Sequence, residues 1–205
     1  MPPRIVNFIF NLFYDRSIIV RILGENSSHR TWKGLPQGSV LSPLLYNIYT
    51  AILDTTVNRF CRILQYADDI ALYTISNSFS QACNCLNSAL FNLNSLLNDH
   101  CLSLSIPKCS AVAFSRKRVI PEINIEICNQ SIPVLSKVKF LGILLDSKLS
   151  GVHHLSYICN KVEKSINVLR ALSGVKWGSH PYSQKLLYNA LIRSHFDYGC
   201  FVLEP

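Results

Sequence analysis

The chain has 205 residues, of which 49% are hydrophobic and 16% are charged. This composition excludes a disordered chain, which combines low hydrophobicity with high charge, and the length fits one mixed domain or one domain with an appendage. Twenty Lys and Arg against twelve Asp and Glu give a net charge of +8, which favours a polyanionic partner. No apolar run reaches the ~18–20 residues that a membrane span needs, so we expect no membrane partner.

The eight cysteines do not form a metal-binding pattern. They are dispersed apart from Cys83 and Cys85, and the sequence has neither a Cys-x-x-Cys motif nor a His pair at zinc-finger spacing. We therefore expect reduced, mostly buried thiols in an intracellular protein. The sequence does not decide between the nucleus and the cytoplasm, nor does it indicate an oligomeric state.

The first third of the chain begins with a predicted short apolar helix over residues 3–14. Residues 17–23 and 29–33 are predicted strands, joined by the hairpin loop 24–28. Two glycines and two prolines within residues 34–43 exclude a regular element there.

The middle of the chain alternates between helical and strand patterns. Apolar residues at helical spacing predict helices over residues 44–60 and 78–98. Between them, residues 62–74 (RILQYADDIALYT) are predicted to form a β-hairpin with its turn at Asp68-Asp69.

The last half begins with short strand-like pieces and ends in helices. The predicted strands cover residues 102–106, 111–115, 123–128 and 138–145. The predicted helices cover residues 152–173 and 181–196, with a connection over 176–181. The change from a mixed to a helical pattern near Ser150 is the best candidate for a boundary.

Two adjacent acids in Tyr66-Ala67-Asp68-Asp69 are the sharpest chemical feature. Carboxylates this close at a tight turn repel each other, and a divalent cation would offset the repulsion. Hard oxygen ligands suit Mg²⁺, which can neutralise phosphate oxygens. A solvated Asp-Asp turn is the alternative for the dipeptide taken alone.

The second feature is the segment GLPQGSVLSP at residues 34–43. Its glycines would let the backbone approach a ligand closely, and it leads into a helix whose N-terminus favours phosphate. The alternative is an ordinary structural loop in which Ser39 or Ser42 caps the helix.

Together, and separated by one helix, these two features resemble the reverse transcriptase family, specifically the enzymes of non-long-terminal-repeat (LINE-type, jockey-like) retrotransposons. GLPQGSVLSPLLYNIYT is similar to their template- and nucleotide-contacting segment, and LQYADDIALYT to the catalytic hairpin of the polymerase palm. LSLSIPKCSAVAFS (102–115) resembles the next palm motif, although Ser105 and Cys109 stand where the family usually has Asn and Thr. KFLGILLD (139–146) resembles the primer-grip hairpin, and the tail with Tyr198-Gly199 the helical region beyond it.

The resemblance implies an α+β fold: a partial polymerase palm, made of an antiparallel sheet with packed helices, followed by a helical thumb-like region. Residues 1–134 would form the partial palm, residues 135–149 the primer-grip hairpin, and residues 150–205 the thumb or connection region. The implied activity is RNA-directed DNA polymerisation by two-metal nucleotidyl transfer with Mg²⁺, for which Mn²⁺ can substitute. The implied partners are an RNA template, a DNA primer and deoxynucleoside triphosphates.

The resemblance also implies roles for single residues. Asp68 would be a metal ligand, Asp69 a second ligand or nearby charge, and Lys108 would protonate the leaving pyrophosphate or steady its charge. The residues implied to border the nucleotide and template are Pro36, Gln37, Gly38, Ser39 and Tyr66. The residues implied to hold the primer end are Phe140, Leu141 and Gly142. Lys108 could equally be an ordinary exposed lysine, and Phe140 and Leu141 ordinary core residues.

The family carries a further metal-binding aspartate on an earlier palm strand, and fingers, upstream of the glycine-rich segment. The acids before Gly34 are Asp15 and Glu25, and neither has the expected strand context. We therefore expect an N-terminally truncated polymerase that is inactive by itself. The alternatives are a non-catalytic nucleic-acid-binding remnant, or a two-metal nuclease using Asp68 and Asp69, against which the glycine-rich segment argues.

Overall fold

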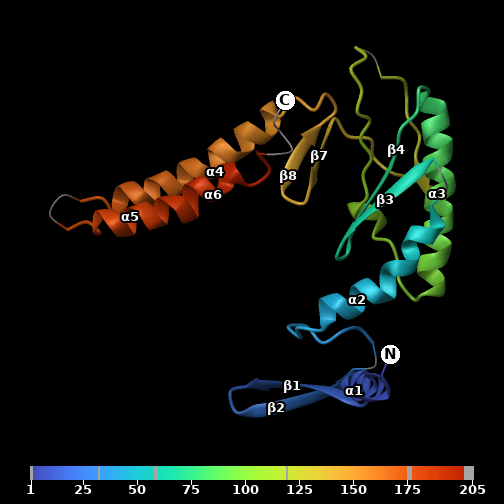
Figure 1. Cartoon of the computed structure of the whole chain (residues 1–205), viewed down its shortest axis with the longest axis horizontal. Coiled ribbons are helices and arrows are strands. Elements are labelled where there is room, and N and C mark those ends of the chain that lie inside the picture. The colour runs from blue at the N-terminus through green and yellow to red at the C-terminus, as the bar shows by residue number, and fades with distance from the viewer. Residues whose placement is uncertain (1, 32, 58–59, 119, 175–176, 201–205) are drawn as a thin grey trace. The chain divides into compact units, whose positions relative to one another are not determined.

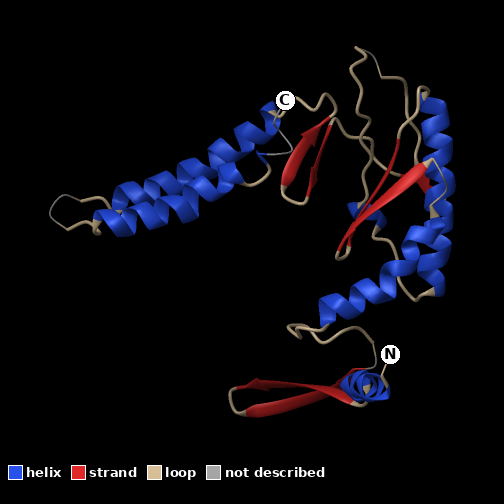
Figure 2. Ribbon diagram, in the orientation of Figure 1, coloured by secondary structure: helices blue, strands red, loops and turns tan. Residues whose placement is uncertain are grey.

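The computed structural model describes residues 2–31, 33–57, 60–118, 120–174 and 177–200. The chain divides into two compact units, one of residues up to 73 and one of residues from 74 onward, and each is described separately. In the described part of the chain, helices alternate with two-stranded sheets (Figures 1 and 2). The predicted α+β class is therefore confirmed.

The first unit begins with helix α1 (Pro3–Phe13) and a hairpin of β1 (Arg16–Ile22) and β2 (Glu25–Thr31). The strands pair antiparallel, with Arg16 opposite Thr31 and Ile22 opposite Glu25. Their link is the two-residue turn Leu23-Gly24, whose φ angles of 50° and 91° match the geometry of tight hairpins. The predicted loop over 24–28 is therefore wrong, because residues 25–28 extend the strand despite their loop-like composition.

The next helix is shorter than the predicted helix over 44–60. Helix α2 spans Ser42–Thr50 and tightens into a 3-10 helix over Ala51–Thr56. The Thr50 hydroxyl donates to the carbonyl of Tyr46, four residues earlier, at 2.9 Å. A threonine that bonds back in this way competes with regular helical geometry, which accounts for the early end of α2.

Strands β3 (Cys61–Tyr66) and β4 (Asp69–Thr74) form the predicted hairpin. The turn lies at Ala67-Asp68, one residue before the predicted Asp68-Asp69, because Asp69 already belongs to β4. Ala67 has a φ of 51°, a left-handed conformation that L-residues other than glycine adopt at a cost.

The second unit is built on helix α3 (Phe79–Asp99), which confirms the helix predicted over 78–98. Its apolar face packs on a cluster centred on Ile125, Ile127 and Ile132, which lies around the short pair β5 (Glu126–Ile127) and β6 (Gln130–Ser131).

Of the strands predicted after α3, the three over residues 102–106, 111–115 and 123–128 are wrong or too long. Residues 102–105 carry no strand and lead into a 3-10 turn over Ile106–Lys108, and residues 111–115 contribute only a bridge from Ala111 to Val134. Within 123–128, only β5 is a strand. Leu104, Ile106, Ala111 and Ile123 of these segments pack, together with α3, against the isoleucine cluster, so their apolar character reflects burial rather than strand pairing.

The remaining elements agree with the predictions more closely. Strands β7 (Lys137–Phe140) and β8 (Ile143–Asp146) pair antiparallel, with Phe140 opposite Ile143, in the region predicted as strand-like over 138–145.

The helical end of the chain confirms the helices predicted over 152–173 and 181–196. Helix α4 (Val152–Ala171) packs against a continuous segment of α5 (Pro181–Tyr188), a π-helix (Asn189–Arg193) and α6 (Ser194–Asp197) (Figure 1). Ile158, Val162 and Ile192 form the buried core between them. Part of the predicted connection 176–181 lies outside the described residues. No described helix is long and apolar enough to span a membrane.

Candidate functional site

The glycine-rich segment folds into a loop held closed by serine hydroxyls. Ser42 Oγ donates to the carbonyl of Pro36 at 2.6 Å, and Ser39 Oγ accepts from the backbone N–H of Leu41 at 3.3 Å. Gly38 has a φ of 84° and open space where a Cβ would stand. Between the partly buried Pro36 and Ser39, Gln37 and Gly38 lie exposed at the tip of the loop, where a ligand can reach them.

The other end of this loop is held by Arg16. The Arg16 guanidinium donates from Nη2 to the carbonyl of Gly34 at 2.6 Å and lies 5.3 Å from the centre of the Phe13 ring. The loop is thereby attached to both the first hairpin and α2.

Gln65 connects the acidic turn to α2. Its Nε2 donates to Thr50 Oγ1 at 2.6 Å and to the carbonyl of Ala67 at 3.1 Å. Thr50 is only 2% exposed, and its hydroxyl donates in turn to the carbonyl of Tyr46. One side chain therefore joins the last turn of α2 to the backbone of the turn that carries Asp68.

The electrostatics of Tyr46 agree with this arrangement. Burial raises the pKa of the Tyr46 phenol, and the negative charge of Asp68 raises it further. The two predicted motifs are thus attached to opposite ends of one helix: the loop containing Gln37 precedes α2, and the Asp68 turn is bound through Gln65 to Thr50, the last residue of α2.

Asp68 and Asp69 are both exposed. Their carboxylates are the hard oxygen donors that Mg²⁺ prefers, so the chemistry of the pair fits a divalent cation. Among the described residues, however, no group of three or more His, Cys, Asp or Glu could hold a metal ion. The described residues thus present two adjacent exposed carboxylates and no complete ligand set.

Tyr66 ends β3 beside the turn and is 66% exposed, so its ring is accessible to a ligand. Lys108 belongs to the second unit, where it is exposed at the end of the 3-10 turn. Next to it, the Cys109 thiol donates to the carbonyl of Ser105 at 3.4 Å, and burial raises the pKa of Cys109. The roles predicted for Tyr66 and Lys108 stay predictions.

The predicted primer-grip residues lie at the end of the β7–β8 hairpin, also in the second unit. Phe140 closes the ladder opposite Ile143, and Leu141 and Gly142 form the turn with φ angles of 46° and 84°. The carbonyl of Leu141 accepts a hydrogen bond from the Tyr198 hydroxyl at 2.5 Å.

The hairpin is joined to α4 by a buried carboxylate. Asp146 accepts from the backbone N–H groups of Ser150 at 3.1 Å, Gly151 at 3.3 Å and Lys148 at 3.3 Å. Burial alone would raise the pKa of Asp146, but these hydrogen bonds lower it below its usual value. Nearby, His154 Nδ1 accepts from the N–H of Leu144 at 3.1 Å.

Sequence reasoning missed Gln65 and Asp146 as positioning groups. A signal was present for both: Gln65 is a polar residue within an apolar strand, and Asp146 precedes Ser150-Gly151 at the start of a helix.

An open pocket of 620 Å³ near the start of α3 contains none of the predicted site residues. Its lining includes Asn77, Asn84, Asn87, Lys117 and Asn124.

Comparison with known proteins places these motifs in a family. Residues 2–145 match the model described as reverse transcriptase (RNA-dependent DNA polymerase). The chain is 32% identical over 193 residues to the probable RNA-directed DNA polymerase from transposon BS of Drosophila melanogaster, covering 90% of this chain and 21% of that protein. It is 28% identical over 165 residues to the RNA-directed DNA polymerase from mobile element jockey of the same fly, covering 77% of this chain and 18% of that protein.

A third relative is the probable RNA-directed DNA polymerase from transposon X-element of Drosophila melanogaster, which is 26% identical over 183 residues, or 85% of this chain and 20% of that protein. The chain thus spans about a fifth of the length of these relatives. No solved structure matches it. The chain belongs to the reverse transcriptase (RNA-dependent DNA polymerase) family, as the glycine-rich loop and the Tyr66–Asp69 turn indicated.

Proposed function

We propose that this chain contributes the Asp68–Asp69 part of the metal site of an RNA-directed DNA polymerase, together with the loop that borders template and nucleotide. The observation that carries this proposal is the attachment of both motifs to α2, through Ser42 at one end and Gln65 at the other. The loop would border the nucleotide. Helix α2 would hold this loop and the two carboxylates at fixed positions relative to each other.

Each group has a definite task in the transfer. The primer 3′ hydroxyl loses its proton to solvent as its oxygen forms a bond to the α-phosphorus of the nucleotide, and the bond to pyrophosphate breaks. When bound, Mg²⁺ would supply positive charge that offsets the negative charge of the phosphate oxygens. Asp68 and Asp69 hold the charge that attracts the cations, and Gln37, Gly38 and Ser39 position the base pair. Lys108 donates a proton to, or steadies the charge of, the pyrophosphate.

The other assignments follow the same proposal. Residues 1–134 form a partial palm, residues 135–149 a primer-grip hairpin and residues 150–205 a thumb or connection region. Phe140, Leu141 and Gly142 hold the primer end. An RNA template, a DNA primer and deoxynucleoside triphosphates are the ligands.

We further propose that these 205 residues alone bind a primer–template but do not extend it. The support is that no described His, Cys, Asp or Glu completes a metal-holding group with the pair of carboxylates, because Mg²⁺ demands near-octahedral ligation. The net charge of +8 favours binding of the polyanionic primer–template, and this binding does not depend on a complete metal site. Other residues of a protein as long as the relatives would complete the ligand set.

Metal binding tests the role of the carboxylates directly. We expect Mn²⁺, followed by electron paramagnetic resonance, to bind the wild-type chain weakly, and the Asp68→Ala variant to bind it at least several-fold more weakly. Asp54→Ala, which removes another exposed acid from the same unit, is the control and should match the wild type. Equal Mn²⁺ affinity for all three proteins would refute a metal role for Asp68.

Primer extension on an RNA template, with Mg²⁺ and then Mn²⁺, tests the incompleteness of the site. We expect salt-sensitive binding of the primer–template and no incorporation by the wild type, Asp68→Ala or Asp54→Ala. Incorporation that disappears only in Asp68→Ala would show that another carboxylate of this chain completes the site. That result would preserve the catalytic assignment and overturn the proposed inactivity.

A further inference from the structure

The turn of the β7–β8 hairpin has an unfavourable sequence for its conformation. Leu141 and Gly142 both have positive φ angles, 46° and 84°. Glycine adopts this conformation freely, whereas a leucine clashes through its Cβ and is rare there. The first hairpin has the same kind of turn at Leu23-Gly24, but the Leu141 turn is also stabilised by a residue outside it.

Tyr198 supplies that stabilisation. Its hydroxyl donates to the carbonyl of Leu141 at 2.5 Å, although the two residues are 57 positions apart in the chain. Its ring also covers the turn, since a Cβ at Gly142 would lie 3.2 Å from Tyr198 Cε1. Gly142 is thus needed both for its φ angle and for the close approach of the tyrosine.

The next residue, Gly199, makes a second contact with the same hairpin. A Cβ at this position would lie 3.0 Å from Cδ1 of Ile143, and its φ of 82° also favours glycine. The pair Tyr198-Gly199, for which no role was assigned above, therefore packs against the hairpin turn through both residues.

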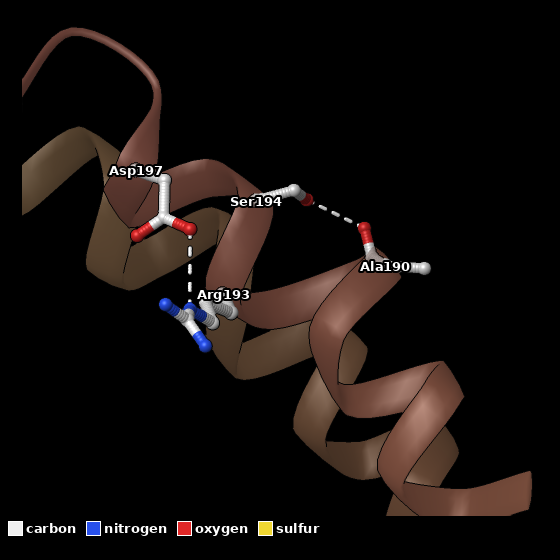
Figure 3. Close-up of polar contacts among 4 residues, drawn as sticks. All are labelled: Ala190, Arg193, Ser194 and Asp197. Carbon is white, nitrogen blue, oxygen red and sulfur yellow. Dashed lines mark hydrogen bonds and ion pairs between the residues drawn. The ribbon is translucent and has the colours of Figure 1, made fainter.

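The segment before Tyr198 is held in shape by local contacts. Arg193 Nε lies 3.2 Å from Asp197 Oδ2, and Ser194 Oγ donates to the carbonyl of Ala190 at 2.5 Å. Figure 3 shows both pairs on successive turns of one helical segment. The N–H of Tyr198 closes this segment by donating to the carbonyl of Ser194 at 3.1 Å.

We infer that Tyr198 and Gly199 are positioning residues that fix the Leu141-Gly142 turn, so that the helical end of the chain sets the geometry with which the turn holds a primer end. The inference rests on the proposed function for its primer role. The contacts themselves do not depend on that function: the Tyr198 hydroxyl bonds to the Leu141 carbonyl, its ring lies over Gly142, and Gly199 lies against Ile143.

The test uses the 205-residue chain with Tyr198→Phe, which removes a single hydroxyl. Tyr182→Phe, at an exposed position in α5, is the matched control. Hydrogen exchange of the Ile143 amide reports on the turn. Loss of one hydrogen bond is expected to speed this exchange roughly 2- to 12-fold.

The second readout is the affinity for a duplex with a recessed primer 3′ end, relative to single-stranded RNA of the same length. We expect Tyr198→Phe to reduce this ratio by roughly 2- to 12-fold and to leave single-strand affinity unchanged, because only the primer end meets the turn. A purely structural role would move both affinities together. Gly199→Ala should act in the same direction.

Each outcome is decisive. Unchanged exchange at Ile143 in Tyr198→Phe would overturn the inference whatever the binding data show. Faster exchange with an unchanged affinity ratio, in a chain whose wild type prefers the recessed end, would refute the positioning role alone. A wild-type chain with no preference for the recessed end would refute the proposed primer-grip function, and with it the positioning role.

Discussion

Asp146 offers the sharpest stability prediction, because one buried carboxylate accepts three backbone N–H groups. The side chain is 6% exposed, and its two oxygens lie 3.1–3.3 Å from the nitrogens of Lys148, Ser150 and Gly151. These bonds join β8 to the start of α4. The perturbation is Asp146→Asn, which keeps the volume and removes the charge and one acceptor.

The expected loss follows from these contacts. The amide nitrogen of asparagine cannot accept, so at least one N–H loses its partner, at about 1.5–3 kcal/mol for a bond to a charged group. The remaining bonds weaken because the acceptor is neutral. We therefore expect the free energy of unfolding to fall by about 3 kcal/mol, and the melting temperature by roughly 6–12 °C for a chain of this size.

The pH dependence gives an independent check. The pKa of Asp146 lies below its usual value of 3.8 in the folded chain. A lowered folded pKa adds stability that is fully present above the unfolded pKa and is lost as the pH falls through the folded pKa. The difference between wild type and Asp146→Asn should thus be constant at neutral pH and shrink below about pH 4.

Thermal unfolding followed by circular dichroism from pH 7 to pH 3 measures both effects. Asp99→Asn, at the exposed end of α3, is the control and should change the melting temperature little. A loss for Asp146→Asn below about 0.5 kcal/mol, within the range of ordinary surface substitutions, would refute the reasoning. So would a loss that stays constant to the lowest pH.

Three further predictions concern other parts of the fold. Gln65→Leu should lower stability by about 1–3 kcal/mol in urea unfolding, because it removes two hydrogen bonds that join α2 to the turn; an unchanged midpoint would show that the link is not formed. Gly38→Ala should cost about 1–2 kcal/mol from its φ of 84° alone, since the space around it is open, and Gly38→Asn should cost less in the same assay. Leu93→Ala, at a side chain 2% exposed, should lower stability by about 2–5 kcal/mol by calorimetry, whereas Phe91→Ala, at an exposed position in α3, should cost far less.

The long helices were predictable from the sequence, whereas several short strands were not. The helices over 78–98 and 152–173 repeat their apolar positions over several turns, so the pattern has few alternatives. The strands expected over 102–106 and 111–115 are rich in apolar residues like real strands, but Leu104, Ile106 and Ala111 pack on the isoleucine cluster, and within these two segments only Ala111 makes a β-bridge. Pairing is a property of two segments, and one segment alone cannot reveal it.

The motifs of the candidate site could be recognised in the sequence, whereas the contacts that support them could not. Asp68 and Asp69 taken alone are compatible with a solvated turn, and they indicated the family only together with the glycine-rich segment. The Gln65–Thr50 and Tyr198–Leu141 hydrogen bonds depend on distances across the fold. Such contacts leave no fixed spacing in the sequence, which is why positioning residues escaped the prediction.

The π-helix over Asn189–Arg193 joins α5 to α6, which ends one residue before Tyr198. A π-turn contains one residue more than a regular α-turn, and each residue of an α-helix advances the chain by about 100° around the axis. Removing one residue from Asn189–Arg193 would convert this turn into an α-turn that covers nearly the same rotation, whereas removing one residue from α5 would rotate all that follows by about 100°. Tyr198 would keep its side of the helix in the first case and lose it in the second, so the π-turn is where this segment can change its length by one residue.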